Sequence, residues 1–177
     1  MRWCVRCSTG VAIALAAMAL AATPCTPAWA ETATVPADFK LRLTSASLAP
    51  PRDPPDIQWV EIEASGAARL SEYRRGGKAL PATTLKLTSK DVAQIYQAIV
   101  QQKFFELKPE YRDPNVQGGD QAIMRVTANG KTHTVRAANI RVNALDAIAR
   151  TVNAALPADR AIRYNALHVN SYTAVDR

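Results

Sequence analysis

Two short turn signals, each set between stretches of alternating apolar and polar residues, constrain the fold of this chain most strongly. Asn129-Gly130 interrupts residues 121–137, and this dipeptide is the preferred two-residue connection of a β-hairpin because both turn positions need a positive φ. Ser65-Gly66 interrupts residues 57–73, where a loop of Ala64-Ser65-Gly66 puts the glycine at the left-handed position. The sequence therefore predicts two hairpins.

Each hairpin has one register that sorts its side chains by polarity. In the first, Val60 faces Leu70 and Ile62 faces Ala68. In the second, Val126 faces His133 and Met124 faces Val135. The apolar face of each hairpin is the predicted core side. The opposite face then carries Trp59, Glu61, Arg69, Tyr73, Arg125, Thr127, Thr132, Thr134 and Arg136.

A helix with one apolar stripe follows the first hairpin. Thr88 and Asp91 form a capping box at its start, and the helix is predicted to run to about Lys103. Residues 104–107 then add bulky core material. The stripe recurs at helical spacing and consists of Val92, Ile95, Tyr96, Ile99 and Val100.

A second helix follows the second hairpin, from about Asn143 as N-cap, with Asp146 in its first turn, to Leu156 before Pro157. Residues 108–120 are polar and rich in proline and glycine, which predicts a loop. Residues 162–164 are a candidate short strand.

The hairpin-helix order occurs twice, after a first strand over residues 39–44 and a proline-rich connection. Because every hairpin and helix has one apolar side, we predict an α+β fold. It is an antiparallel sheet, formed by the strand and the two hairpins, with two helices packed on one face as a two-layer sandwich.

The N-terminus is typical of a cleavable secretory signal. Arg2 and Arg6 precede an uncharged apolar run over residues 10–22, and Ala28-Trp29-Ala30 supplies the small-residue cleavage site. The apolar run is shorter than the roughly 20 residues of a membrane span. We therefore expect cleavage after Ala30, no transmembrane segment in the mature chain, and a periplasmic or secreted product.

All three cysteines (Cys4, Cys7 and Cys25) lie within the predicted signal, so the mature chain has no disulfide and no thiol chemistry. It keeps about 147 residues, which suffices for a core without cross-links. The predicted organisation is a signal at 1–30, a strand and connection at 31–56, one α+β domain at 57–156, and a tail at 157–177.

Several stretches, within about residues 57–156, resemble a family of short exported bacterial domains of unknown function. They are the Ser65-Gly66 hairpin, the helix entry at 87–89, the run Phe104-Phe105-Glu106-Leu107, and the Asn129-Gly130 hairpin before a short final helix. Many members of that family carry a cysteine and proline motif in the first strand, and residues 57–64 have neither. The resemblance implies the fold and export, and it implies no activity.

The sequence has no motif for a nucleophile–base pair, a metal site or a cofactor loop. Its two histidines, His133 and His168, lie too far apart to form a metal signature. His133 shares the core side of its hairpin, where a histidine is usually structural. The enzymatic alternative is a small periplasmic hydrolase that uses His133 with a carboxylate of the 108–120 loop.

Aromatic and arginine side chains on the polar side of the sheet favour an interaction surface, since protein interfaces are enriched in both. The candidate binding residues are Trp59, Arg69, Tyr73, Arg125 and Arg136. The leading hypothesis is an exported non-catalytic binding module for an unknown protein or envelope component. The net charge of +7 is dispersed, so nucleic acid is not indicated.

A basic stretch offers a third hypothesis, an accessory envelope protein that contacts anionic polymers. Arg69, Arg74, Arg75 and Lys78 surround Gly76-Gly77 without the order of a phosphate-binding loop. The alternative to a working surface around Trp59 is that the N-terminal strand or the C-terminal tail covers this side chain.

Overall fold

The structure, a computed structural model, describes residues 33–47, 57–73, 80–115, 119–163 and 174–175. The chain divides into two compact units, Met1–Ala30 and Glu31–Arg177, and every described residue belongs to the second. The predicted signal, the proline-rich connection, Arg74, Arg75, Lys78 and His168 lie outside the described residues.

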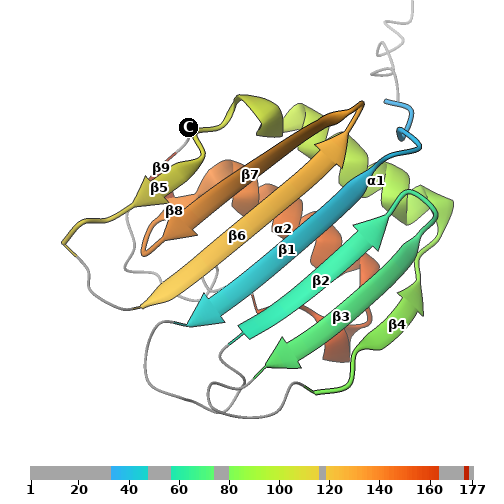
Figure 1. The fold of residues 1–177 in the computed structure, drawn as a ribbon, viewed down its shortest axis with the longest axis horizontal. Coiled ribbons are helices and arrows are strands. Elements are labelled where there is room, and N and C mark those ends of the chain that lie inside the picture. Colours follow the sequence, from blue (N-terminus) through green and yellow to red (C-terminus); the bar gives the residue numbers. More distant parts are fainter. Residues whose placement is uncertain (1–32, 48–56, 74–79, 116–118, 164–173, 176–177) are drawn as a thin grey trace, which may run out of the picture. The chain divides into compact units, whose positions relative to one another are not determined.

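The second unit is a two-layer α+β fold, as the sequence predicted (Figure 1). A seven-stranded sheet has the order β4-β3-β2-β1-β6-β7-β5. Its strands are β1 (Lys40–Ser47), β2 (Ile57–Glu63), β3 (Ala67–Tyr73), β4 (Thr83–Lys86), β5 (Glu110–Arg112), β6 (Asp120–Ala128) and β7 (Lys131–Ala138).

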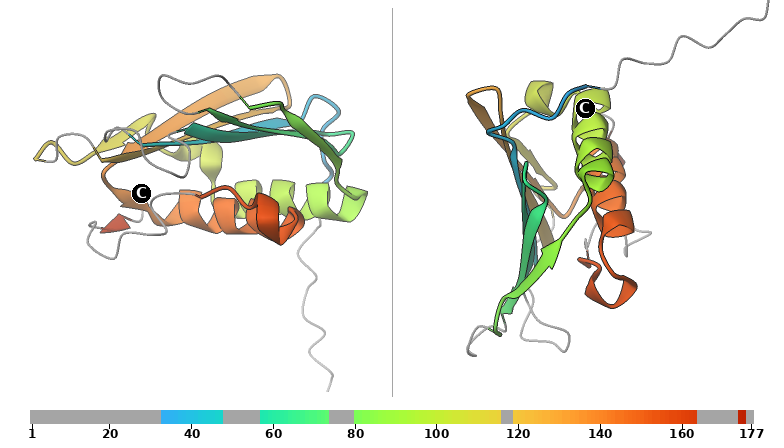
Figure 2. Two further views of the ribbon diagram at one scale, coloured as in Figure 1. Left: turned by 90° about the horizontal axis from the view of Figure 1, so that it is seen from below. Right: turned by 90° about the vertical axis from the view of Figure 1, so that its right-hand side faces the viewer.

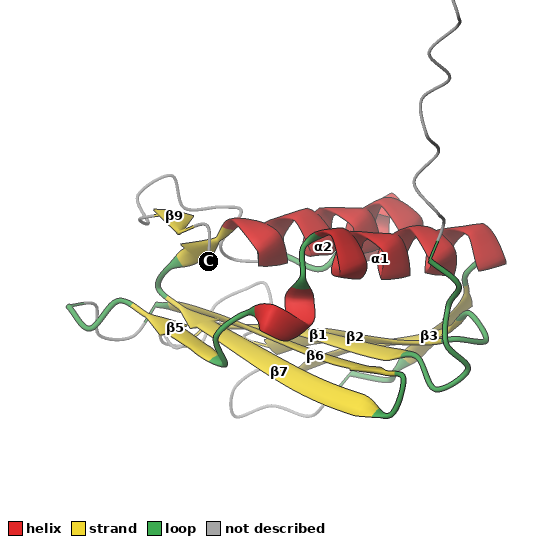
Figure 3. Ribbon diagram, turned by 90° about the horizontal axis from the view of Figure 1, so that it is seen from above, coloured by secondary structure: helices red, strands yellow, loops and turns green. Residues whose placement is uncertain are grey.

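Two helices, α1 (Ser89–Gln101) and α2 (Asn143–Ala155), lie side by side on one face of the sheet (Figures 2 and 3). The remaining elements are short: the 3-10 turns η1 (Phe104–Glu106) and η2 (Ala158–Arg160), and the pair β8 (Arg141–Val142) with β9 (Ala174–Val175). We call the sheet face turned toward the helices the inner face and the other the outer face.

Both hairpins have the predicted registers. Val60 pairs with Leu70 and Ile62 with Ala68, while Val126 pairs with His133 and Met124 with Val135. Gly66 has φ +83, and Asn129 and Gly130 have φ 53 and 72, which is the geometry their turn signals required. The alternation of buried and exposed residues along these strands therefore sets the inner and outer faces.

The first strand lies between the two hairpins and joins them into one sheet. Leu41 pairs with Ile62 on one side and with Val126 on the other, and Leu43 pairs with Val60 and Met124. Both leucines are fully buried. A single core forms where these strands meet the helices, and it contains Val60, Ile62, Ile99, Phe104, Val126 and Leu145.

Helix α1 begins as predicted, with Thr88 Oγ1 accepting from Asp91 N and the Asp91 carboxylate accepting from Thr88 N. Its buried stripe is Val92, Ile95, Tyr96 and Ile99. Val100, predicted to belong to the stripe, is 44% exposed because it lies one residue beyond the buried face.

Several finer expectations were wrong. Residues 108–120 are not all loop, because β5 pairs in parallel with the end of β7. Phe105 is 37% exposed and lies outside the core. The N-cap of α2 is Val142 instead of Asn143. Ile162 and Arg163 form no strand, because the Ile162 backbone bonds the side chain of Asn153 instead.

Candidate functional site

The outer face of the sheet carries all five candidate binding residues. Four of them occupy strand positions that alternate with buried ones: Trp59, Arg69, Arg125 and Arg136. Tyr73 is exposed at the end of β3, on the same side as Arg69. No described helix or strand packs on this face, which Figure 1 views directly and Figure 2 shows from its edges. The first strand contributes to this face as a neighbour of Trp59 in the sheet, and it does not cover the indole.

Trp59 lies in the middle of the outer face beneath two guanidinium groups. The Arg42 Cζ is 4.7 Å from the indole centroid, and the Arg69 Cζ is 5.9 Å from it. Both distances fall within the range of cation–π attraction. The indole is partly buried by this arrangement. Trp59 therefore acts as a platform that holds two arginines from β1 and β3 over one ring.

Arg42 is a site residue that sequence reasoning missed. The alternation of residues 39–44 already placed it on the polar side of a strand. Its neighbours could not be predicted, because they depend on β1 pairing with both β2 and β6 across loops of different length. No local pattern in the chain encodes that strand order.

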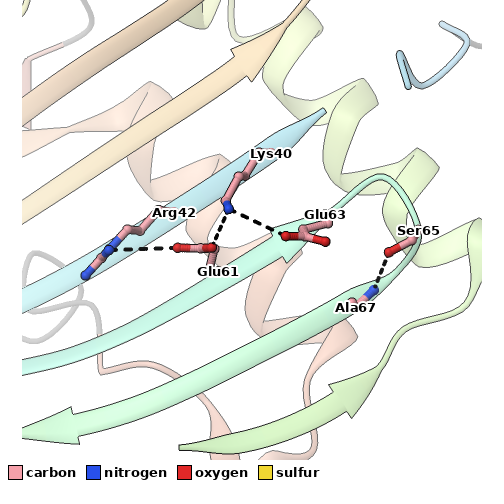
Figure 4. A network of polar contacts seen from close by, with 6 residues as sticks. All are labelled: Lys40, Arg42, Glu61, Glu63, Ser65 and Ala67. Carbon is pink, nitrogen blue, oxygen red and sulfur yellow. Dashed lines mark hydrogen bonds and ion pairs between the residues drawn. The ribbon is translucent and has the colours of Figure 1, made fainter. Parts of the chain in front are cut away.

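A network of charges joins β1 to β2 on the outer face (Figure 4), and its member Arg42 also contacts Trp59. Lys40 Nζ lies 2.6 Å from Glu61 Oε1 and 3.5 Å from Glu63 Oε1, while Arg42 Nη1 lies 3.8 Å from Glu61 Oε2. The hydrogen bond to Glu61 raises the pKa of Lys40 above its usual value. The two glutamates thus both pair with Lys40, and among the described residues Glu61 is the ion-pair partner of Arg42, at the longer distance.

Arg125 stands directly opposite Arg42 across the β1–β6 pair. Among the described residues, no carboxylate lies within ion-pair distance of Arg125. The two arginines line an open depression of about 300 Å³ together with Lys40, Glu61 and Thr127. Three cations around one glutamate make this depression positively charged.

Arg136 and Tyr73 do not line this depression. The Arg136 guanidinium donates to the side-chain carbonyl of Gln121, in the amide orientation that satisfies both groups. Tyr73 pairs with Ile57 at the opposite end of β3 from the Glu61–Arg69 pair. The structure therefore brings Trp59, Arg69 and Arg125 together with Arg42, and it leaves the other two candidates at separate places on the same face.

His133 lies on the inner side of β7, as its hairpin register predicted. Its Nε2 is 2.9 Å from the Leu107 carbonyl oxygen, and the ring packs edge-on against Phe104 at 5.5 Å between centroids. Of the loop carboxylates, Glu110 points to the outer face opposite Arg136, and Asp113 accepts from Asn115 N. In the described part of the chain, His133 therefore has the contacts of a structural residue and no acid–base partner.

No group of three or more metal-ligating side chains gathers among the described residues. Neither described helix has the length and apolar character that crossing a bilayer requires. No family model matches this chain, and no curated protein is significantly similar to it. The family resemblance drawn from the sequence accordingly stays a prediction.

Proposed function

We propose that this protein is an exported, non-catalytic binding module whose outer sheet face contacts its partner. The observation that carries the proposal is the pair of arginines stacked on Trp59 beside Arg125, on a sheet face without a described covering element. Guanidinium groups that are held in place lose little freedom when they bind, which favours recognition.

Export rests on the N-terminal pattern of a basic segment, an apolar run and Ala28-Trp29-Ala30. The proposed product begins at Glu31 and is periplasmic or secreted, where an envelope component or a protein is its partner. Mass spectrometry of the protein recovered outside the cytoplasm should give the mass of residues 31–177. A product that retains residues 1–30, or a lipid on Cys25, would contradict this proposal.

The geometry gives the hydrolase alternative no support. His133 bonds a backbone carbonyl, and the nearby Glu110 faces the other side of the sheet. The envelope alternative shares its chemistry with the binding module, since both need a basic surface, although Arg74, Arg75 and Lys78 lie outside the described residues. The cluster around Trp59 is therefore the better candidate surface.

A photoreactive amino acid placed on each layer tests which face binds. Thr134 is exposed and pairs with Arg125 on the outer face, whereas Val100 is exposed on α1. In envelope extracts, the probe at Thr134 should form an adduct that weakens in the Arg125→Ala background, and the probe at Val100 should form none. An adduct from Val100 alone would place the working surface on the helices and refute the proposal.

A further inference from the structure

The arginines of the outer face form part of a row that crosses six strands. Successive pairs place Thr134, Arg125, Arg42, Glu61, Arg69 and Thr84 side by side from β7 to β4. Like charges directly opposite one another destabilise a sheet. Arg42 and Arg125 are such a pair, and Glu61 lies on the far side of Arg42, so an anion bound between the two arginines would relieve their repulsion.

The chemistry of this row selects oxyanions. A guanidinium offers parallel N–H donors that match the two oxygens of a carboxylate, and Arg125 has no acidic partner among the described residues. Neighbouring strands are about 4.8 Å apart, so Arg125 and Arg69 are separated by roughly 14 Å. That span exceeds one small ion and fits a ligand with several spaced charges.

We propose that the outer face binds an extended acidic polysaccharide whose carboxylates pair with Arg125, Arg42 and Arg69. This inference rests on the proposed function and names the ligand class. Hydroxyl groups border the arginines, with Thr127 Oγ1 and Thr132 Oγ1 2.8 Å apart beside the depression, and Thr134 and Thr84 at the ends of the row. Hydroxyls together with guanidinium groups complement a sugar chain that carries both hydroxyls and carboxylates.

Two other anionic partners fit the outer face less well. A lipid surface would need exposed aliphatic side chains, yet the exposed large aliphatics of the described residues are Val100 on α1 and Leu80 before β4. An acidic peptide would need partners for its backbone amides, which sheets provide at their edges and not on their faces. The row of charged and hydroxyl groups offers neither exposed aliphatic side chains for a lipid surface nor partners for the backbone amides of a peptide.

Titration calorimetry with polygalacturonate tests the proposal on the purified protein. Binding should weaken steeply as salt rises from 20 to about 200 mM, because charge pairing drives it. Arg42→Ala and Arg125→Ala should each lower the affinity about tenfold. Arg150→Ala removes the same charge from an exposed position on α2 and should change the affinity less than about twofold.

The remaining outcomes separate the ligand class from the surface. The proposed binding site would be overturned if Arg150→Ala lowered the affinity for polygalacturonate as much as the two outer-face variants do. It would also be overturned if those two variants bound polygalacturonate as tightly as the wild type. Binding of polyglutamate or of anionic vesicles as tight as that of polygalacturonate would overturn the polysaccharide assignment. An adduct at Thr134 without polygalacturonate binding would leave the proposed function standing and reject only this inference. Far-ultraviolet circular dichroism and a cooperative urea transition check that each variant is folded.

Discussion

At the scale of single residues, Asp38 joins the start of the described chain to the tip of the second hairpin. Its Oδ1 accepts from Asn129 N at 2.9 Å, and its Oδ2 accepts from Gly130 N at 2.7 Å. These backbone donors, Gly130 first, lower the pKa of Asp38 below its usual value. The ionised carboxylate therefore stabilises the turn, even though it lies on the surface.

This coupling predicts a pH-dependent contribution to folding. Because the pKa of Asp38 is lower in the folded state, its stabilisation is fully present above the unfolded value of about 3.9 and is lost as the pH falls through the folded value. Asp38→Asn keeps one acceptor and removes the charge. Its free energy of unfolding should be lower than that of the wild type at pH 7.

The difference in the free energy of unfolding between the wild type and Asp38→Asn should shrink as the pH falls below about 4. Urea denaturation at several pH values measures it. A gap that stays constant over this range would show that the charge of Asp38 does not support the turn.

Single residues also show where sequence reasoning succeeds and stops. The turn at Asn129-Gly130 was predictable because its backbone requirement is local. The contact between that turn and Asp38 was not, since it joins positions 91 residues apart. Arg42 illustrates the same limit in the candidate site: the strand pattern gave the direction of its side chain, and only the strand order gave its neighbours.

At the scale of elements, α1 separates buried from exposed positions within one turn. Ile99 is fully buried, whereas its neighbour Val100 is 44% exposed. The two side chains are similar aliphatics on the same helix. They therefore form a matched pair for measuring what burial contributes.

Ile99→Ala should lower the free energy of unfolding by about 2–5 kcal/mol, because it removes buried methyl groups and leaves a cavity. Val100→Ala should change it by less than about 0.5 kcal/mol, as surface substitutions usually do. Chemical denaturation of both variants gives the comparison. Similar losses of unfolding free energy in the two variants would mean that the buried side of α1 has been assigned incorrectly.

The elements that escaped sequence reasoning are short and depend on tertiary contacts. β5 has three residues and forms because Glu110, Tyr111 and Arg112 pair in parallel with β7. Residues 108–120 carry loop signals throughout, so no local preference indicates a strand there. The start of α2 was missed by one residue, which is the ordinary precision of a helix boundary.

At the scale of the whole molecule, the two hairpin-helix units depend on β1. The sequence predicted a strand, two hairpins and two helices in one sandwich, and the structure has them. The sequence did not show where in the sheet the first strand lies. In the structure, β1 pairs with β2 and β6 along nearly its full length, so it separates the two hairpins within the sheet.

The predicted domain boundary at residue 57 can be tested on this basis. A fragment of residues 57–156 lacks Phe39, Leu41 and Leu43, which are buried in the core. It should show no cooperative unfolding transition, because both hairpins would expose an unpaired strand edge. A fragment of residues 33–163 should regain the transition. Cooperative melting of the 57–156 fragment would show that the boundary is correct.

The central position of β1 also governs when folding can finish. Leu43 pairs with Met124, about eighty residues later in the chain. Ribosomes add 5–20 residues each second, so the first strand waits roughly 4–16 s for β6 to be made. Contacts between such distant positions form late and slowly. Until Met124 has been made, β1 therefore lacks its partner β6 and the sheet stays incomplete, which is compatible with the proposed export because translocation needs an unfolded chain.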